Sequence, residues 1–367
     1  MRKIDVFIPT FNRAIMLELL LYSIHLNLKC YNHIYVFYEV SDDYFLQGYD
    51  KCKIKYEKIF NDKISFIKKK SLGHTSELFN KYIKNDLLIL TDDCMLINEF
   101  NLIESPSSKV FFKDKKILSN SLRYSIDMND QSPSNERSTG LFKNDKTNVN
   151  NQIFNFAKPQ FINFNYTDHV NEDHNNITPD YGIWNIFDSL NSTSASSFLN
   201  PSLQIFRKED FLRWIKNFSS EKSFLNITSA LNKEYYPKIF GNKFLYFLLN
   251  VLDKAYHSIC KMRNNQNIRA SHIFKNFFSS YLSKRKNISL PYLMCCPKNQ
   301  VGFDYNIGSF HQIKNIEIFK YLNEQYLFDY RINYKKFKLV KMKYNFPYIT
   351  IDTKYFIKHL LTKNDKK

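Results

Sequence analysis

The first hundred residues alternate apolar runs of strand length with amphipathic segments of helical spacing. The runs IDVFIPT, HIYVFYEV, KISFIKK and DLLILT each predict a strand. Apolar residues at helical spacing predict a helix in NRAIMLELLLYSIHLN, with Asn12 as its N-cap, and another in TSELFNKYIKN, opened by Thr75. Strands that alternate with helices predict a mostly parallel sheet covered by helices on both faces.

A parallel sheet also predicts where a ligand binds. Ligands of such sheets lie at the carboxyl ends of the strands. This rule gathers along one rim four segments that lie apart in the sequence: residues 9–13, 39–43, 70–74 and 91–93.

The rest of the chain changes character twice. Residues 119–200 are rich in Asn, Ser, Asp and Thr, which predicts long loops or a lid with short structured pieces around QFINFNY and YGIWNIF. Helical spacing then dominates, in KEDFLRWIKNF, NKFLYFLLNVLDKAYHSICKM, ASHIFKNFFSSYLSKR and IEIFKYLNEQYLF. We therefore divide the chain into an α/β half (1–118), a loop-rich insertion or lid (119–200), a helical half (201–312) and a C-terminal extension (313–367).

Composition and charge narrow the function classes only in part. Apolar residues make up 44% of the chain and charged residues 24%, as in ordinary globular proteins. The net charge of +18 favours anionic partners such as phosphorylated substrates, acidic lipids or nucleic acid. A solvated surface enriched in lysine by AT-rich codons explains the same charge. We expect no nucleic-acid partner, because helix-turn-helix, zinc-finger and RNP-like signatures are all lacking.

Cysteine usage and hydropathy predict a cytoplasmic protein. The six cysteines form no CxxC pair and no zinc-ligand spacing, which is typical of reduced thiols. The N-terminal apolar run is interrupted by Asp5, and the longest apolar stretch, FLYFLLNVL, is too short to span a bilayer. Peripheral contact with an anionic membrane is compatible with the positive charge.

Two adjacent carboxylates, Asp92 and Asp93, follow the fourth apolar run. Like charges beside a buried strand repel unless they turn to solvent or hold a cation. Carboxylate oxygens suit Mg²⁺ or Mn²⁺. The pair therefore indicates either a solvated turn or a divalent metal site.

Three motifs follow one another along the chain: DVFIPTFNR before a helix, then GHTSELFNKYI, then LLILTDD. Together they resemble the N-terminal half of a family 2 glycosyltransferase with the GT-A fold, over about residues 1–105. The resemblance implies a Rossmann-like, mostly parallel sheet flanked by helices, with a helical C-terminal acceptor region. It also implies an enzyme that moves a sugar from a nucleoside diphosphate to a glycan, lipid-linked saccharide or protein, inverting the anomeric carbon.

The resemblance implies specific roles for residues at the expected rim. Asp93 would bind Mn²⁺ or Mg²⁺, with Asp92 nearer the ribose or a metal-bound water. The sequence FYEVSDD departs from the family pattern, so Glu39 is the best match to a base-contacting acid and Asp42 competes with it. The implied donor-binding set is Pro9, Thr10, Phe11, Arg13, Glu39, Gly73, Asn80 and Asp92.

The C-terminal half offers further candidates. The segment PKNQVGFDYNIGSFH resembles one in related transferases that leads to a histidine facing the donor diphosphate or metal, which makes His311 a candidate metal ligand. A histidine packed in an irregular loop is the competing interpretation. Trp184 and Trp214 would suit a sugar ring, although buried tryptophans are more often core.

An inverting reaction needs a carboxylate that takes the proton of the acceptor hydroxyl. The candidates are Asp210 and Glu209, then Asp180, with Glu172 and Asp173 as further options. Residues 208–210 also have the pattern of an ordinary helix start, with acids in the first turn.

Three alternatives compete with the transferase. A nucleotidyltransferase usually shows a glycine- and lysine-rich loop after the first strand, and PTFNRAIML has none. A basic nucleic-acid-binding protein and a non-catalytic GT-A-like protein stay open.

Overall fold

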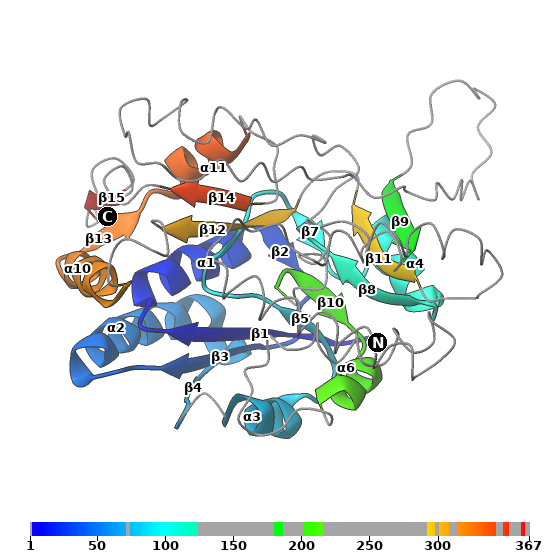
Figure 1. Ribbon diagram of the computed structural model, residues 1–367, viewed down its shortest axis with the longest axis horizontal. Helices are drawn as coiled ribbons and strands as arrows, with labels where there is room; N and C mark the ends of the chain where they lie inside the picture. The colour runs from blue at the N-terminus through cyan, green and yellow to red at the C-terminus, as the bar shows by residue number, and fades with distance from the viewer. Residues whose placement is uncertain are drawn as a thin grey trace, which may run out of the picture.

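The computed structural model describes residues 2–70, 74–123, 180–185, 202–215, 292–297, 301–307, 315–342, 348–351 and 361–363. A central eight-stranded sheet organises these residues, and helices pack against it (Figure 1). In spatial order the strands are β4 (Ile64–Lys68), β3 (Ile34–Glu39), β1 (Ile4–Phe11), β5 (Asp86–Ile89), β10 (Gln204–Phe206), β8 (Ile117–Ser121), β11 (Tyr292–Pro297) and β9 (Tyr181–Asn185).

The sheet is mostly parallel. β4, β3, β1 and β5 run in one direction, and β8 and β11 run parallel to each other. β10 is antiparallel to both β5 and β8, and β9 is antiparallel to β11. This mixed α/β architecture, a mostly parallel sheet flanked by helices, confirms the expected fold class and is consistent with a GT-A-like fold.

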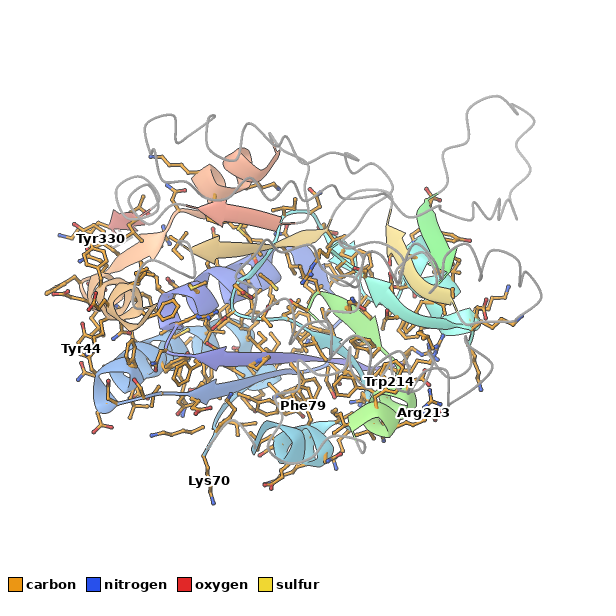
Figure 2. All side chains as sticks on the ribbon, in the orientation of Figure 1. Tyr44, Lys70, Phe79, Arg213, Trp214 and Tyr330 are labelled. Atoms are coloured by element: carbon orange, nitrogen blue, oxygen red, sulfur yellow. The ribbon has the colours of Figure 1, made fainter. Side chains whose placement is uncertain are left out.

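The two faces of the sheet carry different side chains, because successive residues of a strand point to opposite faces. On one face Val6 and Ile8 pack in an apolar core with α1 (Ala14–Asn27) and α2 (Asp43–Phe60). On the other face Phe7 stacks on Phe79 of α3 (His74–Tyr82), with ring centroids 5.2 Å apart. Figure 2 shows Phe79 on α3 and Trp214 on α6 (Lys208–Ile215), on the same side of the sheet.

Smaller elements surround the sheet. A second, three-stranded sheet has the order β14 (Tyr348–Ile351), β12 (Gly302–Ile307) and β6 (Cys94–Leu96). Two short ladders pair β13 (Tyr330–Ile332) with β15 (Leu361–Lys363), and β2 (Leu28–Lys29) with β7 (Phe100–Asn101). The other elements are the 3-10 helix η1 (Asn61–Lys63), α4 (Pro106–Lys113), α10 (Asn315–Leu327) and α11 (Tyr334–Met342). Among the described residues, none of the helices has the length and apolarity to cross a membrane.

Several sequence predictions are refined by these elements. The predicted N-terminal strands and the helices over 12–27, 75–85 and 316–328 are confirmed, with ends shifted by a few residues. The boundary placed at 118/119 falls within β8. β9 falls on the structured piece expected around YGIWNIF, whereas β10 and β11 join the main sheet from the half expected to be helical. The helices expected over 242–262 and 270–285 and the structured piece around QFINFNY lie outside the described residues.

Asn12 is not the N-cap of α1, which corrects the sequence prediction. Its φ of 56° lies in the left-handed region, whereas an N-cap residue is extended. Its side chain instead joins the ends of two neighbouring strands, because Asn12 Oδ1 accepts from the Ser41 N–H at 2.9 Å. Asn12 Nδ2 donates to Ser41 Oγ, also at 2.9 Å. Arg13 occupies the N-cap position without a capping side-chain bond.

Gly48 allows α2 and α10 to approach each other closely. A Cβ atom at Gly48 would lie 2.1 Å from Asn323 Oδ1 and 3.0 Å from the Ala14 Cβ. Asn323 has little room to move, since it is 1% exposed and its Nδ2 donates to the Tyr44 carbonyl at 2.9 Å. A glycine inside a helix costs about 1 kcal/mol relative to alanine, so close packing is the physical reason for a glycine here.

We predict that Gly48→Ala lowers the free energy of unfolding by about 1–2 kcal/mol, because overpacking outweighs the gain in helix propensity. Urea unfolding of the single variant measures this loss. The same substitution in an Asn323→Ala background should cost clearly less, since the clashing amide is then gone and only the contact with Ala14 is left. An equal loss in both backgrounds would contradict the packing explanation.

Candidate functional site

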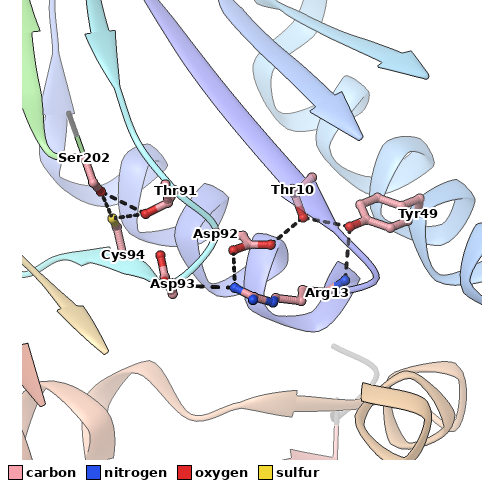
Figure 3. Close-up of polar contacts among 8 residues, drawn as sticks. All are labelled: Thr10, Arg13, Tyr49, Thr91, Asp92, Asp93, Cys94 and Ser202. Carbon is pink, nitrogen blue, oxygen red and sulfur yellow. Dashed lines mark hydrogen bonds and ion pairs between the residues drawn. The ribbon is translucent and has the colours of Figure 1, made fainter. Parts of the chain in front are cut away.

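The carboxyl ends of β1 and β5 bring together the residues of the candidate site. β1 and β5 are adjacent and parallel, so the residues that follow them meet at one edge of the sheet. Thr10 and Arg13 come from the end of β1, and Asp92 and Asp93 from the turn after β5. Tyr49 reaches the same point from α2 (Figure 3).

Hydrogen bonds link four of these residues in a closed ring (Figure 3). Thr10 Oγ1 donates to Asp92 Oδ2 at 2.6 Å, and Arg13 NH1 donates to Asp92 Oδ1 at 2.9 Å. The Arg13 backbone N–H donates to the Tyr49 hydroxyl at 3.1 Å, which lies 2.7 Å from Thr10 Oγ1. Thr10 has one hydroxyl proton and gives it to Asp92, so Tyr49 must donate to Thr10. Both Asp92 oxygens are thus occupied by this ring.

Asp92 and Asp93 differ in environment although they are neighbours. The side chain of Asp92 is 5% exposed and that of Asp93 36%. Burial raises the pKa of Asp92, and Asp93 raises it further, while Arg13 and the Thr10 hydrogen bond lower it. Asp92 in turn raises the pKa of Arg13. Arg13 NH1 lies 3.9 Å from Asp93 Oδ2, so one cation offsets the repulsion between the two carboxylates.

These positions fit a divalent cation that takes one carboxylate from the protein and its other ligands from phosphates and water. In the part of the chain that the structure describes, no three His, Cys, Asp or Glu side chains gather as a metal cage. With Asp92 engaged by Thr10 and Arg13, Asp93 is the more accessible carboxylate of this pair. Mg²⁺ commonly binds through one or two carboxylates and completes its shell with phosphates and water.

A second charged pair lies along the rim, at the carboxyl ends of β3 and β4. Lys69 Nζ is 3.4 Å from Glu39 Oε2, and the Lys69 side chain is only 4% exposed. Burial lowers the pKa of Lys69, and Glu39 opposes this shift. Phe11 pairs in register with Glu39 and is 42% exposed, an unusual exposure for a large aromatic side chain. Lys70, the next residue, points away from the sheet (Figure 2).

The structure gathers most of the predicted donor set. Thr10, Arg13 and Asp92 are in direct contact, and Pro9, Phe11 and Glu39 lie along the same rim. Asp42, the competitor of Glu39, caps α2 by accepting from the N–H groups of Tyr44 and Phe45. Asn80 is exposed on α3. Gly73 and His311 lie outside the described residues, as do Glu172 and Asp173.

The structure does not bring Glu209 and Asp210 to this rim. β10 runs antiparallel to β5, so the helix that follows it, α6, begins at the opposite edge of the sheet (Figure 1). The Lys208 N–H donates to Asp86 Oδ1, at the start of β5. Asp210 Oδ1 accepts from Arg213 NH2 at 3.1 Å. The acids of residues 208–210 thus fit the alternative of an ordinary helix start.

Asp180 does lie at the carboxyl edge. It precedes β9, in which Tyr181 pairs with Pro297 at the end of β11. Four strand spacings separate β9 from β5 in the sheet order, which is roughly 19 Å along a flat sheet. Of the two tryptophans, Trp214 is fully buried against Phe206, as its core interpretation predicts. The side chain of Trp184 lies outside the described ones.

Three residues of the site were not named from the sequence: Tyr49, Lys69 and Phe319. Phe319 of α10 lies over the guanidinium of Arg13, with the Arg13 Cζ atom 4.9 Å from the ring centroid. Lys69 ends the run KISFIKK. In a lysine-rich chain, nothing in the sequence separates a buried lysine at a strand end from the solvated lysines elsewhere. Tyr49 belongs to a helical spacing of Phe45, Tyr49, Cys52 and Tyr56, and this spacing was a usable signal for α2.

Comparison with known proteins gives low similarities. No protein-family model and no curated protein matches the sequence. Among solved structures, mannosyltransferase PcManGT from Pyrobaculum calidifontis, in complex with GDP-Man and Mn²⁺, is 14% identical with a TM-score of 0.27, over 33% of this chain and 35% of that one. TarS of S. aureus is 14% identical with a TM-score of 0.33, over 62% of this chain and 33% of TarS.

The fragment 1–349 of TarS gives a TM-score of 0.31 at 14% identity, over 62% of this chain and 54% of the fragment. The chain thus spans between a third and about half of the length of these proteins. TM-scores this low transfer no residue role to this chain, so the site has to be judged by its own geometry.

We predict that Tyr49→Phe lowers the free energy of unfolding by about 1–3 kcal/mol, since the Arg13 N–H and the Thr10 hydroxyl then lose a buried partner. The phenyl ring keeps the packing of Tyr49, so the loss reports on the hydroxyl. Tyr44→Phe, on the same helix and partly exposed, is the control and should change stability by less than about 0.5 kcal/mol. Equal stability of wild type and Tyr49→Phe in urea unfolding would contradict the hydrogen-bonded ring.

Proposed function

We propose that this protein is a glycosyltransferase whose nucleoside diphosphate sugar binds at the carboxyl edge of the main sheet. One observation carries the proposal: the turn after β5 buries Asp92 against Thr10 and Arg13 while Asp93 stays accessible beside it. A fixed inner carboxylate with an accessible outer one is a preorganised arrangement for the charged part of a ligand. The order of motifs in the sequence supports the same function.

The charges at the rim suit a diphosphate. Arg13 offers a guanidinium whose position is fixed by Asp92. Asp93 would hold Mn²⁺ or Mg²⁺, and a cation bound there would neutralise charge on the departing diphosphate. The role proposed for Asp92 is to orient Arg13 from within the protein, close to the ribose side of the ligand.

The base of the nucleotide would lie toward β3 and β4. Phe11 offers an exposed aromatic surface on which a base can stack. Beside it, Glu39 and Lys69 supply an acceptor and a donor of hydrogen bonds. Pro9 keeps the end of β1 extended, which holds this aromatic surface next to Glu39.

The acceptor would be a glycan, a lipid-linked saccharide or a protein hydroxyl, and transfer would invert the anomeric carbon. Inversion needs a carboxylate on the face opposite the leaving group. Asp180 is our candidate for this carboxylate, because among the predicted acids that the structure describes it alone precedes a strand at the carboxyl edge of the sheet. Peripheral contact with an anionic membrane belongs to the same proposal and rests on the net charge of +18.

We expect one nucleoside diphosphate to raise the melting temperature of the protein, with a larger rise when Mn²⁺ is present. A ligand that binds only the native state at 100 times its dissociation constant adds about 2.7 kcal/mol, which corresponds to a shift of several degrees. Thermal unfolding with UDP, GDP, CDP, ADP and TDP, each with and without MnCl₂, measures this. Asp93→Asn should keep the fold and lose the Mn²⁺-dependent part of the shift.

Glu57→Gln is the matched control, because Glu57 is an exposed carboxylate on α2 that pairs with Lys53. It should retain the full shift. If no nucleotide changes the melting temperature of folded wild-type protein, the transferase proposal fails and a non-catalytic GT-A-like protein becomes the better interpretation. If the Mn²⁺-dependent shift in melting temperature is unchanged in Asp93→Asn, only the metal role of Asp93 is rejected, and the transferase proposal stands.

A further inference from the structure

The C-terminal extension returns to the candidate site through α10. This helix lies beside α2, near the carboxyl end of β1 (Figure 1). Its residue Phe319 is partly buried, and the Arg13 Cζ atom lies 4.9 Å from the centre of its ring. A guanidinium at this distance over an aromatic face is attracted by the ring quadrupole.

Arg13 therefore has two kinds of contact. Its NH1 atom is bound to Asp92, at 2.9 Å, and faces Asp93 at 3.9 Å. Its Nε atom is buried and has no hydrogen-bond partner among the described residues. With no hydrogen bond at Nε among the described residues, the contact with the ring of Phe319 is a further restraint on the guanidinium beside Asp92.

The position of Phe319 is itself fixed by α2. Lys51 of α2 donates to the Tyr326 carbonyl at 2.5 Å, near the end of α10, and forms an ion pair with Asp329 at 2.7 Å. The Asn323 amide donates to the Tyr44 carbonyl. α2 also supplies Tyr49, which binds the backbone of Arg13. One helix thus sets both the backbone of Arg13 and the ring that covers its side chain.

We propose that Phe319 is a positioning residue for donor binding, which holds the Arg13 guanidinium against Asp92 and Asp93 and so makes α10 part of the donor site. This inference rests on the function proposed above. A long side chain that is fixed before the ligand arrives loses less rotamer entropy on binding, so the ring improves affinity without touching the diphosphate. The affinity gain expected from a cation–π contact of this kind is about 3- to 10-fold.

Calorimetric titration of the same five nucleoside diphosphates with MnCl₂ tests this. Phe319→Leu keeps apolar volume and loses the ring face. It should therefore raise the dissociation constant of the nucleotide that binds wild type by about 3- to 10-fold. Phe319→Tyr keeps the ring and should bind like wild type. Phe328→Leu is the control, because Phe328 follows α10 directly and is 63% exposed; it should leave the affinity unchanged.

A double-mutant cycle separates positioning from general packing. In an Arg13→Met background, Phe319→Leu should cause no further loss of affinity, because the cation that the ring holds is gone. If Arg13→Met does not fold, the contrast between Leu and Tyr at position 319 decides the question alone. Equal affinity of folded Phe319→Leu and wild type overturns this inference and leaves the transferase proposal standing. Absence of nucleotide binding to wild type overturns both.

Discussion

The ion pair between Arg13 and Asp92 is the interaction on which the rest of the rim depends. A buried carboxylate next to a second carboxylate is unfavourable unless a cation and hydrogen bonds offset its desolvation. Arg13 and Thr10 supply these, and Tyr49 binds both of them. Asp92 can therefore stay buried and charged only while β1, β5 and α2 keep their relative positions.

The same dependence extends to elements behind the rim. Gly48 and Tyr49 are neighbours on α2, so the glycine that admits α10 and the tyrosine that binds Arg13 occupy adjacent positions of one helix. α10 then returns Phe319 to the side chain of the same arginine. Two helices far apart in the sequence thus act on one residue, and packing between them is part of the geometry of the site.

The sequence predicted the N-terminal strands and the rim because both depend on simple patterns. β1 and β5 are buried on both faces, and β3 largely so, and all three read as apolar runs. Parallel strands also end at one edge. The direction of β10 leaves no such pattern, and its antiparallel course is what carries Glu209 and Asp210 to the far edge. The contact of Phe319 with Arg13 and the left-handed backbone of Asn12 depend on tertiary packing, which a single sequence does not encode locally.

Asp92 and Asp93 look equivalent in the sequence, and their difference arises from the turn that follows β5. The turn directs the first carboxylate toward β1, where Thr10 and Arg13 bind it, and leaves the second at the surface of the rim. A pair of adjacent acids is stable here because the two side chains have different roles. The charge of Asp92 is balanced by Arg13 within the protein, whereas the carboxylate of Asp93 stays accessible.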